Sequence, residues 1–429
     1  MKTALVALSI LFTGRLAFSQ TSASSGDAKS LQFALSKPED VGLSSERLKR
    51  IRALIQSHID AKDFSGAVTL VSRKGKIAQF EAFGIADIEA AKPMKTDTLF
   101  SLLAMTKPFT AVAILMLLEE GKLILSDPVS KFIPEFKNPQ VAVWNMPNDP
   151  AGAGLRLVPS QREITILDLL THTSGVANGF AGPAGDYVRR ANLPRGGSLD
   201  QRVKGLAKLP LNFQPGTQWE YSLVTGYDAL GRVVEILSGM TLEQFFETRI
   251  FQPLGMKNTF FIVPPNRTSD VAVGYNRTEG RLVRRPATVD ETAGPYFSGA
   301  EGLTGSTGDY FLFCQMLQNG GQLNGVRLLS RKTIELMTSV ATGNMDLRNY
   351  SGGDQVLKGY GFGLGVRVRR DNGENGWLGS VGDFGWAGSI GTYFWVDPKE
   401  QMIGIVMTQT RNTRLRTEYP NVVYQSISE

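Results

Sequence analysis

The chain has 429 residues, 42% of them hydrophobic and 20% charged, a balance typical of a globular enzyme that excludes a disordered, collagen-like or coiled-coil protein. One cysteine, Cys314, cannot form an internal disulfide, and two histidines, His58 and His172, are too few for the usual three-ligand zinc site, so we expect no metal or other cofactor. The net charge of +6 arises from 46 basic residues scattered among 40 acidic ones, which indicates a solvated surface and not a nucleic-acid partner.

Residues 1–19 have the features of a signal peptide. Lys2 supplies a positive start, residues 4–12 form a short apolar core, and Ala17-Phe18-Ser19 offers small residues for cleavage before Gln20. The apolar run is too short to span a bilayer as an anchor. We therefore expect an exported protein, periplasmic or secreted, with no membrane span after signal cleavage and with residues 20–35 as a flexible mature N-terminus.

Two elements are predicted early in the mature chain. Apolar residues recur at helical spacing from Ser44 to Ile59, and Ser44 or Ser45 can serve as the N-cap. The β-rich segments 66–71 and 77–83 flank a polar cluster at 72–76, which is typical of a hairpin.

Helical patterns dominate the middle of the chain, and strand patterns return near its end. Helices are predicted at 102–120, 166–170, 225–238 and 242–254. Strands are predicted at 363–369, 390–396 and 402–408. We therefore predict one α+β domain over residues 36–420. Its antiparallel sheet comes from about 36–100 and 300–420, is flanked by helices, and has a helical region, about 101–299, inserted between its two parts.

One lysine lies in an otherwise apolar helix. The segment from Leu99 contains Lys107 and continues to Gly121, a suitable residue to end a helix. Burial of an ammonium group costs free energy unless the group is paired, so Lys107 is either partnered or held with a depressed pKa for proton transfer. A structural lysine that snorkels to the surface is the alternative.

The segment around Lys107 resembles the Ser-x-x-Lys helix of the serine β-lactamase and penicillin-recognising superfamily, in the branch of class C β-lactamase-related esterases. Further segments resemble that branch in the same order, so that roughly residues 38–410 are covered. These segments are Pro38–Leu43, Glu119–Leu123, Thr171–Gly175, Trp219–Ser222, Pro253–Met256, Gly302–Asp309 and Gly385–Asp397. The resemblance implies a β-lactamase-like fold.

The resemblance also implies roles for particular residues. In that family a serine is acylated, the lysine three positions later is its base partner, and a tyrosine from a later loop handles a second proton. Lys107 and Tyr221 match the lysine and the tyrosine, and residues three apart share a helix face. Trp386-Ala387-Gly388 matches the family position that is often Lys-Thr-Gly. The amides of Ser389 and of residue 104 are then expected to form an oxyanion hole.

The sequence departs from the family at the nucleophile, because position 104 is alanine. Ala104 has no lone pair with which to attack and no proton to give, so ordinary turnover should be lost. Ser101 is better interpreted as the N-cap of this helix, and Thr106 points to another face. A pair of His172 with Ser174 is conceivable, but a histidine in a polar turn is more often structural. No Gly-x-Ser-x-Gly elbow is present, which argues against an α/β-hydrolase.

Other residues bear on the substrate. Trp386 cannot offer the cation that a lysine there would present to a β-lactam or peptide carboxylate, so neutral acyl esters are the expected ligands, with β-lactams second. Trp386 as plain core is the alternative. The clusters Arg367-Arg369-Arg370 and Arg411-Arg414-Arg416 are interpreted as surface charge.

Three hypotheses about function remain open at this point. In the first hypothesis the parent protein is an exported serine hydrolase, mainly an esterase, in which Ala104 is an introduced inactivating change. Alternatively, the protein is a natural pseudoenzyme that binds acyl, peptide or cell-wall ligands in the retained pocket. In the third hypothesis the fold is a structural or partner-binding module. The sequence leaves open which of these holds, which acyl or leaving group fits, and the oligomeric state.

Overall fold

An antiparallel sheet of eight strands lies at the centre of the fold. The computed structural model describes residues 1, 33–145, 154–180, 182–193, 197–286, 296–347 and 357–429. The strand order is β13-β14-β15-β16-β17-β1-β2-β3, with all neighbours antiparallel. The strands are β1 (Gly66–Arg73), β2 (Lys76–Asp87), β3 (Lys92–Pro93), β13 (Tyr360–Phe362), β14 (Arg367–Arg369), β15 (Phe384–Ala387), β16 (Tyr393–Asp397) and β17 (Met402–Met407). The predicted α+β class with an antiparallel sheet is confirmed.

The pairing of β1 with β17 joins the two ends of the domain. Val68 lies opposite Met407 in this pair. The predicted hairpin is present as β1 and β2, and its turn places Lys74 and Gly75 at φ values of 50° and 75°. Two consecutive positive φ values characterise the tight turns whose twist matches that of the strands.

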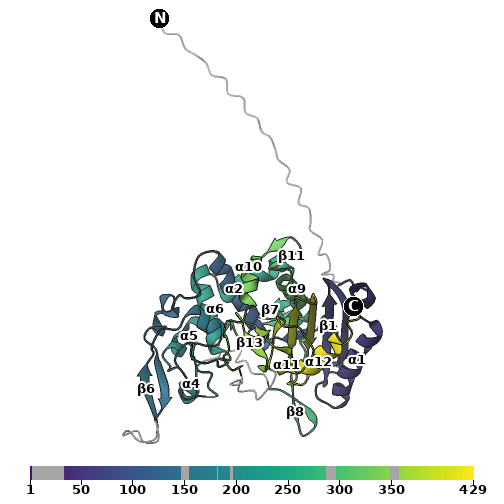
Figure 1. The fold of residues 1–429 in the computed structure, drawn as a ribbon, viewed down its shortest axis with the longest axis horizontal. Helices are drawn as coiled ribbons and strands as arrows, with labels where there is room; N and C mark the ends of the chain where they lie inside the picture. Colours follow the sequence, from purple (N-terminus) through teal and green to yellow (C-terminus); the bar gives the residue numbers. More distant parts are fainter. Residues whose placement is uncertain (2–32, 146–153, 181, 194–196, 287–295, 348–356) are drawn as a thin grey trace. The chain divides into compact units, whose positions relative to one another are not determined.

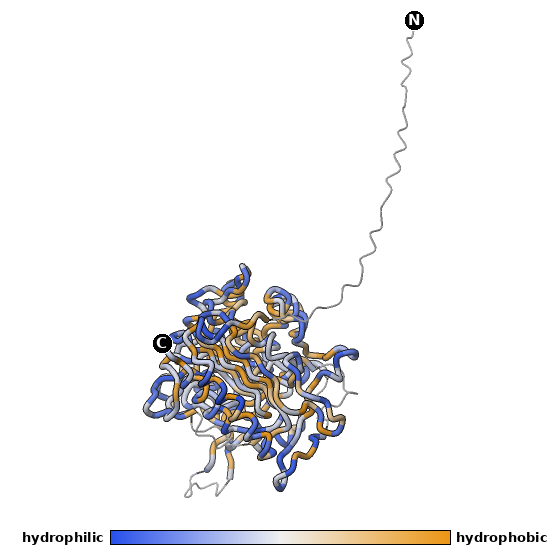
Figure 2. Tube along the Cα trace, turned by 90° about the vertical axis from the view of Figure 1, so that its right-hand side faces the viewer, coloured by the Kyte–Doolittle hydropathy of each residue, from blue (hydrophilic) through white to orange (hydrophobic). Residues whose placement is uncertain are grey.

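Helices cover both faces of this sheet (Figure 1). Alternate residues of β17 face opposite sides, so that Met402 and Val406 pack with α1 (Ser45–Asp60) and α12 (Leu415–Tyr424). Ile403 and Ile405 belong to the larger core, which includes α9 (Thr307–Gln318). Figure 2 shows the strands side by side through the middle of the molecule, coloured mostly as hydrophobic. The predicted N-cap of the first helix is confirmed, because the Ser44 hydroxyl accepts from the Arg47 amide.

The remaining helices lie mainly in the predicted helical region. They are α2 (Lys107–Glu119), α3 (Ile166–Leu170), α4 (Gly185–Ala191), α5 (Leu199–Ala207), α6 (Thr225–Ser238), α7 (Leu242–Phe246), α8 (Gln252–Leu254), α10 (Arg331–Met337) and α11 (Asn372–Asn375). Helix α2 is apolar on all sides and is buried along almost its whole length, as expected for a helix enclosed by others. No helix in the described ranges is both long and apolar enough to cross a membrane.

Several predicted elements have different boundaries, and two of the differences change the local structure. The helix predicted at 102–120 is preceded by β4 (Leu99–Ser101) and starts with a 3₁₀ turn, Leu103–Thr106. Ser101 therefore does not cap the helix; it pairs with Thr304 of β10 (Thr304–Ser306). The strand predicted at 363–369 is the second half of a hairpin, because β13 ends at Phe362 and the chain turns before β14. Gly365, at φ 88°, permits that turn.

The predicted surface location of Arg367 and Arg369 is wrong. Both side chains are buried, at 3% and 2% exposure. Arg367 stacks on the ring of Tyr360 at 4.3 Å and donates to the Tyr393 hydroxyl at 2.6 Å. Arg369 forms a buried ion pair with Asp383, with 2.6 Å between nitrogen and oxygen. Residues two apart on a strand share one face, so both guanidinium groups enter the same aromatic layer.

This buried pair gives a prediction about stability. Asp383→Ala leaves the Arg369 guanidinium buried without its counter-ion, so we expect the free energy of unfolding to fall by about 3–5 kcal/mol. Glu46→Ala is the matched control, because its pair with Lys49 is exposed and should be worth less than about 1 kcal/mol. Urea unfolding monitored by circular dichroism measures both changes. Equal, small losses in the two variants would contradict the prediction.

Candidate active site

Ala104 and Lys107 lie one 3₁₀ turn apart at the start of α2. The Lys107 amide donates to the Ala104 carbonyl, and in a 3₁₀ helix side chains three residues apart lie over one another. Leu103, just before Ala104, has a φ of 46°, which turns the chain sharply out of β4. Thr106 is committed elsewhere, since its hydroxyl accepts from the Leu303 amide at 3.1 Å. The local fold therefore places a lysine amine beside the position of Ala104, which is half-buried.

The Lys107 side chain is only 2% exposed. Its Nζ donates to the Ala300 carbonyl at 3.1 Å. The same atom lies 5.0 Å from the centre of the Tyr221 ring and 5.6 Å from that of Tyr227, and aromatic faces attract an ammonium group at such distances. The structure thus brings together Lys107 and Tyr221, which are 114 positions apart and match the lysine and the tyrosine of the family motifs.

Tyr221 lies in the loop before α6 and is buried. The side-chain amide of Asn178 donates to the backbone carbonyl of Tyr221 at 3.0 Å, which fixes the loop. The Trp386 indole N–H points at its hydroxyl oxygen, at 3.3 Å. Burial raises the pKa of Tyr221 far above its ordinary value, and the opposing effect of the Trp386 hydrogen bond is smaller. The phenol is therefore protonated at neutral pH.

His172 supports this tyrosine from behind. Its ring lies 4.7 Å from the Tyr221 ring in an edge-to-face arrangement. Its Nδ1 accepts from the Ser222 amide at 3.3 Å and lies 2.9 Å from the Ser222 hydroxyl, so the conceivable pair with Ser174 is not formed. Burial, aided by the charge of Lys107, holds the pKa of His172 well below its usual range. His172 is therefore a neutral packing residue, with Ser222 buried beside it.

The turn after β15 approaches the Ala104 segment closely. A Cβ added to Gly388 would lie 2.5 Å from the Leu102 carbonyl oxygen, so only glycine allows this approach. The Thr392 hydroxyl donates to the same carbonyl at 3.3 Å. The strand ends at Ala387, and Ser389 lies exposed in the turn and not on a strand as expected. Within the described ranges, neither the Ser389 amide nor the Ala104 amide donates a hydrogen bond.

The predicted surface location of Arg416 is also wrong. This residue of α12 is buried and its guanidinium donates to the Gly388 carbonyl at 3.2 Å. It thereby holds the turn that carries Ser389. Its charge also lowers the pKa of Tyr221 slightly against the larger effect of burial. No sequence signal distinguished Arg416 from its exposed neighbours, because the contact joins segments 28 residues apart.

A buried carboxylate positions the acceptor of Lys107. Asp228 of α6 accepts from the Ser298 hydroxyl at 2.7 Å and from the Tyr296 hydroxyl, and it pairs with Arg202 at 3.2 Å. Ser298 begins the short segment that ends at Ala300, whose carbonyl binds Lys107. No motif in the sequence indicates this network, although an aspartate among the apolar residues of a predicted helix is a usable signal of it.

The Asp228 carboxyl gives a prediction about pH. Burial raises its pKa to about 6, against the opposing effect of Arg202. Because the folded protein holds this proton to a higher pH than the unfolded chain, the contribution of Asp228 to the free energy of unfolding should fall by about 2 kcal/mol as pH rises from about 4 to 6. Asp228→Asn should lack this fall. Urea unfolding of both proteins from pH 4 to 7 measures it, and a constant difference in stability between them would contradict it.

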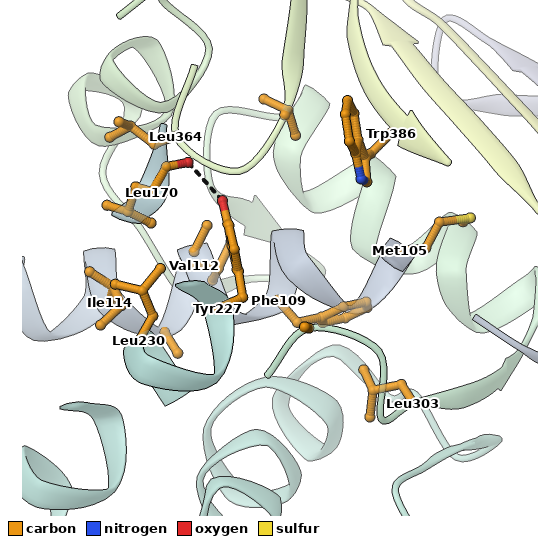
Figure 3. Packing of buried hydrophobic residues seen from close by; sticks show 14 of the residues in the cluster. Met105, Phe109, Val112, Ile114, Leu170, Tyr227, Leu230, Leu303, Leu364 and Trp386 are labelled. Atoms are coloured by element: carbon orange, nitrogen blue, oxygen red, sulfur yellow. Dashed lines mark hydrogen bonds between the residues drawn. The ribbon is translucent and has the colours of Figure 1, made fainter. Parts of the chain in front are cut away.

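Apolar packing fixes the floor of the site. Figure 3 shows Tyr227 standing between α2 and α3, with its hydroxyl directed at the Leu170 carbonyl, a bond of 2.8 Å. Trp386 lies above α2 on the other side of the view, near Met105. These large side chains leave Lys107 and Tyr221 little freedom to move.

The fold and this cluster define a class. An antiparallel sheet with an inserted helical region, and a lysine placed against a tyrosine at the start of the central helix, characterise β-lactamase-like serine hydrolases. The chain belongs to the Beta-lactamase family, whose sequence model matches residues 51–424.

Relatives of known name agree with this assignment. Esterase EstB of Burkholderia gladioli is 36% identical over 282 residues, which cover 61% of this chain and 67% of that protein. Protein Rv1367c of Mycobacterium tuberculosis is 36% identical over 365 residues, 83% of this chain and 89% of that protein. Among solved structures, EstCE1, described as a hydrolase with promiscuous acyltransferase activity, superposes with a TM-score of 0.74 at 27% identity and covers 90% of this chain and 99% of its own.

Proposed function

We propose that this protein is a scaffold for acyl-enzyme hydrolysis of esters whose nucleophile is missing at Ala104. The observation that carries the proposal is that Lys107 lies one 3₁₀ turn from Ala104 and against the ring of Tyr221. The turn at Gly388 packs against the Leu102 carbonyl, two residues before Ala104. The arrangement lacks one oxygen atom, the one a serine would supply. The protein with Ala104 is accordingly catalytically impaired.

The residues support a definite sequence of steps for a serine at position 104. Its oxygen bonds to the ester carbonyl carbon while its proton passes to Lys107, which has to react in its uncharged amine form. The carbonyl oxygen, now negative, accepts from the amides of residue 104 and Ser389. The carbon–oxygen bond to the leaving group then breaks, and the Tyr221 phenol, which is protonated at neutral pH, gives that oxygen a proton and regains one from Lys107. Water then attacks the carbonyl carbon of the acyl-enzyme in the same way. The bond from that carbon to the serine oxygen breaks, the serine regains its proton, and the acid is released.

Esters are the proposed substrates, with β-lactams second. Trp386 matches the family position that is often lysine, so the site offers no cation there for a β-lactam carboxylate. The name of EstB supports the same class of substrate. The test gives p-nitrophenyl butyrate and nitrocefin to the Ala104→Ser variant. We expect faster turnover of the ester, and a preference for nitrocefin would overturn the assignment.

A natural pseudoenzyme that binds acyl ligands is the second candidate. The retention of Lys107 and Tyr221 beside Ala104 favours it over a purely structural module. Calorimetric titration of the Ala104 protein with an uncleaved ester should then show saturable binding that Tyr221→Ala weakens. Absence of binding would exclude this candidate.

Export is proposed from the sequence of residues 1–19, which lie almost wholly outside the described residues. N-terminal sequencing of protein from the periplasm or medium of an expressing bacterium should begin at Gln20. Recovery of the intact Met1 terminus from the cytoplasm alone would contradict export.

A further inference from the structure

A groove of about 570 Å³ opens beside the candidate site. Two of its lining residues, Leu103 and Ile390, are the chain neighbours of Ala104 and Ser389, so the groove begins where the ester carbonyl would lie. Its far wall is formed by residues 268, 269, 271–274 and 284–286. A part of the substrate on one side of the reacting carbonyl can therefore extend into it.

The two arginines of this wall differ in their ion pairs. Arg284 lies 3.2 Å from Glu89 and 3.7 Å from Asp87, the one acidic residue of the lining, so these charges neutralise one another. Arg285 is half-buried, and its guanidinium has no ion pair with any side chain in the described ranges. Among the described residues, Arg285 is therefore the cation of the groove lining without an acidic partner.

The Arg285 side chain is held in position. Its amide donates to the Gly274 carbonyl at 2.8 Å. Its stem lies against the same residue, because a Cβ added to Gly274 would be 3.3 Å from the Arg285 Cδ. The guanidinium presents a planar fork of donors that matches a carboxylate with two parallel hydrogen bonds.

We propose that this groove binds a carboxylate at the far end of the ester, and that Arg285 recognises it. The proposal rests on the proposed function and narrows its substrate class to esters that carry a carboxylate remote from the reacting carbonyl. The reacting end meets the uncharged Trp386, and the remote end meets Arg285.

The test measures binding to the full-length Ala104 protein, which should leave the ester intact. Monoethyl adipate carries the carboxylate on the acyl side, the butanoyl ester of 4-hydroxybutanoate carries it on the leaving-group side, and ethyl hexanoate is the neutral control. We expect Arg285→Gln to weaken binding of at least one anionic ester by about tenfold or more and to leave ethyl hexanoate unchanged. The anionic ester that responds identifies the half of the substrate in the groove.

Arg281→Gln is the matched control, because Arg281 is an exposed arginine on β9 (Arg281–Arg284) outside the groove lining. Arg285→Lys should lose less affinity than Arg285→Gln, since it keeps the charge. The proposal would be overturned if, for each anionic ester, the dissociation constant were the same in the Ala104 protein and in Arg285→Gln. Release of ethanol during the titration would instead contradict the missing nucleophile, so the two failures are distinguishable.

Discussion

Ala104→Ser is expected to convert the protein into an esterase, with a rate on p-nitrophenyl butyrate at least about 10³-fold above that of the Ala104 protein. Removal of a nucleophile that acts as a unit with its base costs on the order of 10⁶ in kcat, and restoration should recover much of that factor. The added oxygen needs little room, because position 104 is half-buried and a serine exceeds alanine by one atom. Initial rates at saturating ester measure the gain.

Ala104→Gly is the control for this prediction, because it changes the same position without supplying an oxygen. It should remain as slow as the Ala104 protein. Turnover at equal rates by the Ala104 protein and Ala104→Ser would show that another nucleophile operates. Absence of turnover in both would show that the remaining site cannot support catalysis, and either result would contradict the mechanism.

Lys107→Met in the Ala104→Ser background is expected to remove the gain almost completely, by about 10³-fold or more. The hydroxyl then has no amine to take its proton. Methionine has a similar length and fits a buried apolar helix, so the fold should survive. Lys332→Met is the matched control, because Lys332 is exposed on α10, and it should leave the rate unchanged. Thermal unfolding should show that both variants are folded, and retained activity in Lys107→Met would contradict the role of the lysine.

Many elements of the fold were predictable because their signals are local. Helices α3 and α6 have the predicted boundaries, since their apolar residues repeat at helical spacing within the segment itself. The buried Arg367 and Arg369 were not predictable. Their burial depends on Tyr360, Tyr393 and Asp383, and no local pattern records that these residues converge.

The residues of the candidate site likewise include some that the sequence predicts and some that it does not. Lys107, Tyr221 and Trp386 stand in motifs whose order along the chain resembles that of a known family, and the structure brings them together. Asp228 and Arg416 act through carbonyl groups on distant segments, so neither stands in such a motif. The 3₁₀ turn before Lys107 was not predictable, because its residues are as apolar as those of the helix that it precedes.

The most direct test of the missing nucleophile is the intact mass of the protein after treatment with a fluorophosphonate, a reagent that phosphonylates activated serines. Measured side by side, Ala104→Ser should gain one adduct that peptide mapping places at position 104, while the Ala104 protein should gain none. Labelling of the Ala104 protein at any serine, or the absence of an adduct in a folded Ala104→Ser variant, would contradict the account.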